Sequence, residues 1–188
     1  MTSNHVTDAA PYSAQHSRRV VVAITALALG GFAIGTTEFV TMGLLPEIAR
    51  GIDESIPRTG HIISAYALGV VVGAPVIVSL AARLPRRELA VALVLALGAG
   101  NAVTALAHGY WPVMAARFVA GLPHGAYFGV ASLIAASLVA PERKGRAVSG
   151  VMLGLSVATV VGVPASTWLG QGLGWRSAYW AVVAIAVV

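Results

Sequence analysis

The chain has 188 residues, of which 57% are hydrophobic and only 10% are charged, and its formal net charge is +5. Its mean hydropathy is +0.82, so it carries more apolar surface than one soluble core of this length could bury. This composition excludes a soluble domain and predicts a protein embedded in a lipid bilayer. The basic residues stand in short clusters between apolar blocks, so we expect no nucleic-acid partner.

The polar residues 1–19 precede the first apolar block, and we expect them to form a disordered cytoplasmic tail. A membrane-spanning helix needs about 20 mostly apolar residues, and the remainder, 20–188, contains six such blocks. We place the spans near 20–45, 60–80, 89–108, 111–138, 147–169 and 178–188. The last block is still apolar at Val188, so we expect the sixth helix to be cut off there and the chain to be part of a longer protein.

Basic residues gather at one set of alternating span ends. These residues are Arg18, Arg19, Arg83, Arg86, Arg87, Arg143, Lys144 and Arg146. Because cytoplasmic loops carry an excess of Lys and Arg, we expect a multi-pass protein of the cell membrane with a cytoplasmic amino terminus. Arg18 and Arg19 before an apolar run are also typical of a twin-arginine export signal, but more apolar blocks follow, so we interpret them as an anchor.

The first span contains Glu38 and the fourth contains Arg117, although a charge at membrane depth costs at least about 2.5–3.5 kcal/mol. At 1.5 Å per residue, each lies about 9–11 Å from the predicted outer face. We hypothesise that both face one polar cavity, where they pair or compete for a partner and where Glu38 exchanges a proton for cargo. The alternative is that Arg117 bonds only backbone carbonyls or polar side chains and that Glu38 lies near the interface.

Aromatic residues in the second and fourth spans are candidates for a cargo cavity. They are Tyr66, Tyr127 and Phe128, together with His124, which could contact cargo or a proton. The alternative is ordinary packing against neighbouring helices.

Small residues recur at every fourth position in three spans, as in Gly121 and Gly125 of the fourth and Gly154 and Gly162 of the fifth. Such stripes let helices approach closely in a bilayer, and plain packing is enough to explain any one of them. The second and fifth spans also share a glycine two residues before a proline, at Gly73 and Pro75 and at Gly162 and Pro164. We expect a kink at both sites, and their matching places favour an inverted repeat of three plus three helices.

The sequence contains no cysteine, which excludes disulfides and thiolate metal sites. Its hydroxyl residues and histidines form no pattern of nucleophile, base and orienting group, and it has no phosphate-binding loop. We therefore expect neither an enzyme nor a bound cofactor or metal.

Three stretches resemble the major facilitator superfamily, specifically its drug:proton antiporter branch of arabinose-efflux-like and chloramphenicol-resistance-like permeases. They are GTTEF with GLLPE at 35–47, RFVAGLPHG at 117–125 and GLGWR at 172–176. The resemblance implies a fold of twelve helices in two halves, of which this chain supplies the amino-terminal six, with cargo bound between the halves.

By this resemblance Arg117 matches an arginine linked to proton coupling, Gly121 and Gly125 match its packing glycines, and Gly154, Gly162 and Pro164 resemble the antiporter motif of the fifth helix. Arg83, Arg86 and Arg87 match the basic residues of a cytoplasmic gating loop. That loop usually also holds a glycine and an aspartate, where this chain has Val78 and Ala82, so gating through the aspartate is not implied.

The sequence therefore predicts a transporter for proton-coupled efflux of a small organic molecule of the drug or sugar class. Its partners would be the lipid bilayer, the cargo, protons and the missing carboxy-terminal half. Two alternatives stay open, namely an uptake symporter of the same superfamily and a membrane scaffold or receptor fragment that transports nothing.

Overall fold

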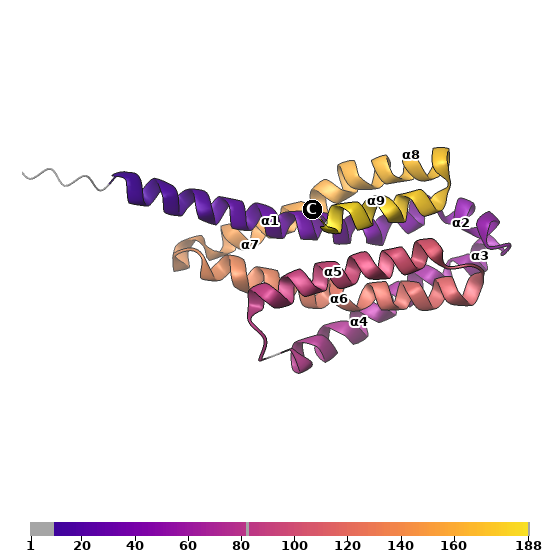
Figure 1. The fold of residues 1–188 in the computed structure, drawn as a ribbon, viewed down its shortest axis with the longest axis horizontal. Helices are drawn as coiled ribbons and strands as arrows, with labels where there is room; N and C mark the ends of the chain where they lie inside the picture. Colours follow the sequence, from indigo (N-terminus) through magenta and orange to yellow (C-terminus); the bar gives the residue numbers. More distant parts are fainter. Residues whose placement is uncertain (1–9, 82, 188) are drawn as a thin grey trace, which may run out of the picture.

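The six apolar blocks form helices that run back and forth along one common axis (Figure 1). The computed structural model describes residues 10–81 and 83–187. Residues 1–9 of the predicted tail, Ala82 after the second span and Val188 in the sixth lie outside the described residues. No strand occurs in the part of the chain that is described, in agreement with the predicted all-α fold.

Nine α-helices, one 3₁₀ turn and one π-helical segment follow one another along the described chain. In order they are α1 (Ala10–Gly43), α2 (Leu45–Gly51), α3 (Ile56–Thr59), α4 (His61–Leu80), α5 (Arg86–Leu106), α6 (Tyr110–Ser137), the 3₁₀ turn η1 (Pro141–Arg143), α7 (Lys144–Val157), the π-helical η2 (Ala158–Gly162), α8 (Val163–Leu173) and α9 (Trp175–Val187). The first four spans correspond to α1, α4, α5 and α6, the fifth to α7 with η2 and α8, and the sixth to α9.

Five stretches of the described chain are long and apolar enough to cross a membrane. They are Ser17–Gly43, Ile56–Leu80, Arg86–Leu106, Tyr110–Ser137 and Pro141–Leu173. The sixth, Trp175–Val187, is a shorter apolar helix. The bounds lie within a few residues of the predicted ones, except at the start of the first helix.

The first helix begins at Ala10, ten residues before the predicted span, so residues 10–19 are helical where disorder was expected. Pro11 stands in the first turn of this helix, where a residue without an N–H group is tolerated. The segment Ser17–Arg19 is exposed, so its helical backbone projects from the packed bundle. Polarity alone therefore misplaced the start of this helix.

The two predicted proline kinks differ in structure. In the fifth span the helix widens into the π segment η2 directly before Pro164, and the Val163 N–H donates to the carbonyl of Ala158, five residues earlier. Such one-turn π segments are a recognised way to break helical regularity. In the second span α4 continues through Pro75 without a break in its assignment.

Glycines bring two pairs of helices into backbone contact. A Cβ atom added to Gly69 or Gly73 of α4 would overlap the backbone of Phe118 or Leu122 of α6. Likewise, a Cβ atom on Gly154 of α7 would overlap the Ala28 carbonyl of α1. Both glycine stripes are therefore used for close helix packing, as small residues are in bilayers.

The same contacts fix the relative direction of these helices. Along α4 and α6 the contacting residues rise together, from Gly69 against Phe118 to Gly73 against Leu122, so the two helices are parallel. The first and fifth spans are parallel for the same reason, because Gly150 meets Ile24 and Gly154 meets Ala28. In an inverted repeat the first, second and third spans correspond to the fourth, fifth and sixth. The pair of the second and fourth spans then corresponds to the pair of the fifth and first, as observed.

A buried polar layer separates two apolar clusters in the bundle. One cluster surrounds Leu97 and Val151, and the other surrounds Leu44 and Val113. The polar layer between them consists of buried side chains from α1, α5 and α6: Thr36, Thr37, Thr41, Asn101, Thr104 and Arg117. Because these polar groups need partners away from water, this layer is where function is to be sought.

Candidate functional site

Arg117 is the centre of the polar layer. Its side chain on α6 is fully buried, with 0% exposure, and its Nη2 atom donates to the Thr37 carbonyl of α1 at 3.1 Å. The guanidinium carbon lies 4.3 Å from the Tyr66 ring centroid of α4 and 5.5 Å from that of Tyr179 of α9. Four helices therefore meet at one cation, which two aromatic faces stabilise.

This arrangement leaves part of the guanidinium without a partner. Among the described residues, no hydrogen-bond acceptor reaches the buried Nε and Nη1 atoms of Arg117. A buried donor without an acceptor costs about 1–3 kcal/mol, and more when it is charged. The site therefore has two guanidinium nitrogens, with three N–H groups between them, available to an acceptor that enters the bundle.

A short hydrogen-bond chain supports this site from α1 and α5. The Asn101 amide of α5 donates to the Thr37 hydroxyl at 3.2 Å and to the Leu97 carbonyl at 2.8 Å. The Thr37 hydroxyl in turn donates to the Ala33 carbonyl at 2.9 Å. These bonds hold α1 and α5 together beside Arg117, and the Asn101 Oδ1 atom remains buried without a partner in the described structure.

Glu38 follows Thr37 on α1 and is half-buried. Its carboxylate lies within electrostatic range of Arg117 and of the Tyr66 hydroxyl. The two ion pairs in the described structure are Arg50 with Glu47 and Arg58 with Glu54, so Glu38 and Arg117 are near one another without direct contact. Arg117 therefore bonds a backbone carbonyl of α1, and Glu38 lies in its field.

Three of the four predicted cavity residues come together around Tyr66. The Tyr66 hydroxyl and His124 Nδ1 are 3.1 Å apart, and their rings meet edge to face at 5.9 Å. The His124 ring also lies 5.4 Å from the Phe128 ring. Tyr66 therefore connects the half-buried His124 and Phe128 to the guanidinium of Arg117.

Tyr127 lies elsewhere. Its hydroxyl donates to the Leu27 carbonyl of α1 at 2.7 Å, and its ring is buried in the apolar cluster around Leu97. The next residue on α6, Phe128, turns toward His124 instead. Of these two aromatic neighbours, only Phe128 belongs to the group around Tyr66.

The glycines of the fourth span help to place Tyr66. A Cβ atom on Gly121 would overlap the Tyr66 carbonyl, and one on Gly125 would press on the Ala74 methyl at 2.8 Å. Because both glycines lack a Cβ, α4 approaches α6 closely enough for the Tyr66 ring to cover Arg117. The packing glycines and the polar site are thus parts of one interface.

The basic residues of the α4–α5 connection are separate from this site. Arg83, Arg86 and Arg87 are all exposed at the end of the bundle, where α4 stops and α5 begins. No interaction joins them to Arg117 in the described structure.

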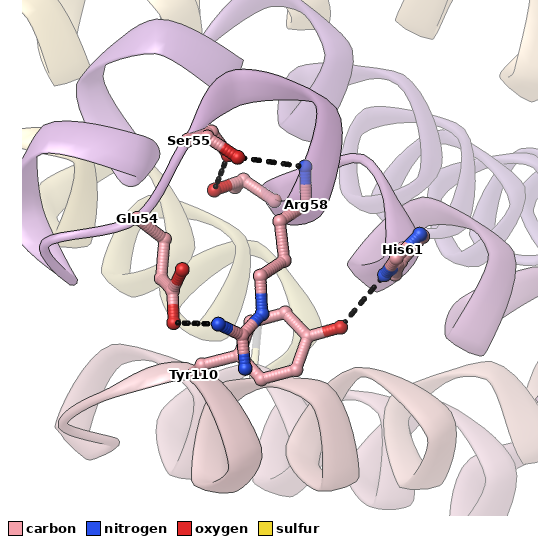
Figure 2. Close-up of polar contacts among 6 residues, drawn as sticks. Glu54, Ser55, Arg58, His61 and Tyr110 are labelled. Atoms are coloured by element: carbon pink, nitrogen blue, oxygen red, sulfur yellow. Dashed lines mark hydrogen bonds and ion pairs between the residues drawn. The ribbon is translucent and has the colours of Figure 1, made fainter.

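The opposite end of the bundle carries a second polar cluster, which we did not predict from the sequence. Arg58 of α3 pairs with Glu54 at 3.2 Å (Figure 2). Its guanidinium carbon is 4.6 Å from the Tyr110 ring centroid. The Tyr110 hydroxyl lies 2.8 Å from His61 Nδ1. These contacts bind the α1–α4 connection to the first turn of α6.

Arg176 makes a similar link at that end. It donates to the Ala107 carbonyl, at the end of α5, at 3.0 Å and lies 4.2 Å from the Trp175 ring centroid. All three connections at this end of the bundle are therefore tied to neighbouring elements. By contrast, the connection that carries Arg83 is exposed.

Sequence reasoning did not identify Asn101, Thr37 or Tyr179 as members of the site. Asn101 gave a usable signal, because an amide in an apolar span needs buried partners. Thr37 bonds Arg117 through its backbone carbonyl, and no sequence pattern reveals a backbone contact of this kind. Tyr179 becomes a neighbour of Arg117 only because α9 packs on the bundle, where its hydroxyl also lies 2.9 Å from that of Thr41.

Comparison with known proteins identifies relatives of the chain. Over 165 residues it is 46% identical to the inner membrane transport protein YdhP of Escherichia coli, a match that covers 88% of this chain and 42% of the relative. It is 42% identical to the putative transporter AraJ of E. coli over 81% of this chain and 39% of the relative. It is 40% identical to a chloramphenicol resistance protein of Streptomyces lividans over 83% of this chain and 40% of the relative.

The chain thus spans about two fifths of the length of these relatives. The family model described as Major Facilitator Superfamily matches residues 27–188, which include every residue of the polar site. This match and the apolar helical bundle establish that the chain is a multi-pass membrane protein of the major facilitator superfamily.

Proposed function

We propose that this chain forms one wall of a secondary transporter that exports a small organic molecule in exchange for protons. The observation that carries the proposal is the half-buried Glu38 carboxylate in the field of Arg117, whose guanidinium is fully buried and incompletely bonded. A charged carboxylate in a membrane bundle is costly, so a conformation that buries Glu38 more deeply would favour its protonated form. Protonation and conformational change would be coupled in this way. A packing scaffold has no need of either charge.

In this proposal Glu38 carries the proton and Arg117 responds to its charge. When Glu38 is ionised, it attracts the guanidinium away from the Thr37 carbonyl. When Glu38 is protonated, Arg117 keeps its bond to Thr37 and its place over Tyr66. The position of the Arg117 side chain would thus depend on whether Glu38 is protonated, and this would transmit the charge of α1 to α4 and α6.

We further propose that cargo lies against Tyr66, His124 and Phe128. Together these side chains offer an aromatic surface, an imidazole and a hydroxyl, which suit an amphiphile with a ring or polar edge. The names of the relatives, which include a chloramphenicol resistance protein and a probable sugar efflux transporter of Pasteurella multocida, favour a cargo of the drug or sugar class.

The second wall of the cavity would come from a further six-helix half, since the relatives are more than twice as long as the matched region. We propose that the two halves bind cargo between them and expose it alternately to each side of the cell membrane. We propose that the first span starts on the cytoplasmic side, which the basic residues Arg18 and Arg19 support. Arg83, Arg86 and Arg87 would then lie in a cytoplasmic gating loop.

The test is efflux by the full-length protein with Glu38→Gln, which keeps the shape of the side chain and removes its ionisation. We expect proton-driven efflux to fall at least about tenfold, as is common when a proton-transfer group is removed. The matched control is Glu142→Gln, because Glu142 is exposed on η1, away from the polar layer. Efflux by Glu38→Gln at the wild-type rate would exclude Glu38 as the proton carrier.

A further inference from the structure

A groove at the bundle end where α1 begins has a composition that the transport proposal does not explain. It has a volume of about 430 Å³, within the range of about 300–1,000 Å³ that is usual for small-molecule sites. Its first wall is Val20, Val21 and Ile24 of α1, and Val139 and Ala147 form its second wall. Arg143 and Arg146 complete the lining.

The two arginines are placed to act together. Arg143 ends η1 and Arg146 lies in the first turn of α7, three residues later, so both point from one face of the same helical run. Both side chains are exposed, and the ion pairs of the described structure hold neither of them. The neighbouring carboxylate, Glu142, is exposed and does not line the groove.

The groove therefore offers two positive charges above an apolar floor. A second groove of about 390 Å³ on α5 provides the contrast, because its lining contains both Arg87 and the carboxylate of Glu88. Of these two grooves, the first combines positive charge with apolar walls from two helices, and no carboxylate lines it among the described residues. That combination complements a molecule with an anionic head and a hydrocarbon tail.

Because the protein is embedded in a bilayer, an anionic phospholipid is a ligand with that chemistry. Basic pockets between membrane helices hold anionic head groups, and neighbouring valines and isoleucine suit the start of an acyl chain. We propose that this groove is a binding site for an anionic phospholipid, with the phosphate on Arg143 and Arg146 and an acyl chain along Val20, Val21 and Ile24. The bound lipid would bridge the first span and the start of the fifth.

The test uses the full-length protein purified in detergent and titrated with dioleoyl phosphatidylglycerol or, in parallel, with dioleoyl phosphatidylcholine. Native mass spectrometry measures the lipid-bound fraction. We expect tighter binding of phosphatidylglycerol. Each basic residue near a membrane surface contributes about 1 kcal/mol, so Arg143→Gln with Arg146→Gln should weaken that binding about thirtyfold, and either change alone about fivefold.

Three comparisons make the result specific. Arg83→Gln, which removes an equally exposed arginine outside the groove, should leave lipid binding unchanged. Val21→Asn, which keeps both arginines but makes the wall polar, should weaken the binding of both lipids. Replacing both arginines with lysine should preserve most of the preference for phosphatidylglycerol, because the charge remains.

The proposal is overturned if the two lipids bind equally well or if Arg83→Gln weakens binding as much as the double variant does. It is also overturned if millimolar inorganic phosphate binds the groove as well as the lipid does, because the acyl chain would then contribute nothing. If the double variant fails to fold, Val21→Asn still tests the proposal. Unchanged lipid binding in that variant would mean that no acyl chain lies along the apolar wall.

Discussion

At the scale of the residue, Tyr66 holds the site together because its ring and its hydroxyl serve different partners. The ring faces the guanidinium of Arg117, while the hydroxyl bonds His124. Substitution can separate these two roles. Tyr66→Phe keeps the aromatic face and removes only the hydroxyl, whereas Tyr66→Leu removes both.

We expect Tyr66→Phe to lower stability by about 0.5–1.5 kcal/mol, the usual net value of one hydrogen bond. Tyr66→Leu should cost more, because it also removes the cation–π contact, worth about 2 kcal/mol when desolvated. The free energy of unfolding in denaturant would measure both effects. Equal losses for the two variants would mean that the ring does not stabilise Arg117.

At the residue scale, the sequence singles out charges in apolar runs, such as Glu38 and Arg117, but it does not reveal a backbone partner such as the Thr37 carbonyl. Glu38 and Arg117 could be placed at similar depth because their distances from the span ends are similar. The direction of Tyr127 could not be predicted, because the rotation of α6 about its axis decides whether its ring faces α1 and Leu97 or Tyr66 of α4. The spacing of residues along one helix does not determine how that helix is rotated against its neighbours.

At the scale of the element, glycines decide how close α4 and α6 approach. Gly121 faces the backbone of Tyr66, whereas Gly129, two turns later on the same helix, has no atom within 4 Å of an added Cβ. The two positions therefore form a matched pair, with the same helix and the same substitution but opposite surroundings.

We expect Gly121→Ala to destabilise the protein by about 1–3 kcal/mol, because overpacking forces the helices apart. Gly129→Ala should be neutral or stabilising by up to about 1 kcal/mol, since alanine is the better helix former. Thermal unfolding in detergent would measure both. If the Tm fell equally in the two variants, close packing at Gly121 would not be the cause.

The helices themselves were largely predictable from the sequence, and their ends were less so. Long apolar blocks gave the second to fifth spans to within a few residues of α4, α5, α6 and the α7–α8 run. The π segment η2 was foreseen only as a weak point near Pro164. Whether a proline produces a π segment or a continuous helix depends on its neighbours, as the uninterrupted α4 around Pro75 demonstrates.

At the scale of the whole molecule, the two ends of the bundle are built differently. The end where α1 begins has exposed basic connections and the groove beside Arg143. The other end is tied by Arg58 to Tyr110 and by Arg176 to Ala107. Because these interactions tie the connections at that end to one another, we expect the bundle to move as one body in the proposed transport cycle.

The orientation of the bundle can be tested in the full-length protein once any cysteines outside these 188 residues have been replaced, because the 188 residues contain none. Ser17→Cys and Gln171→Cys place single thiols at exposed positions on opposite ends. In intact cells a membrane-impermeant maleimide should label Gln171→Cys and not Ser17→Cys, since the basic end belongs in the cytoplasm. Labelling of Ser17→Cys alone would reverse the orientation.

The most direct test of the central claim is cargo-driven proton movement in sealed vesicles that contain the full-length protein and a dye for internal pH. With chloramphenicol as the first cargo tried and a sugar panel next, an antiporter must move protons opposite to the cargo, and Glu38→Gln must abolish that movement. Proton movement in the same direction as the cargo would identify a symporter. A cargo that crosses the membrane without any proton movement would contradict coupling through Glu38 and Arg117.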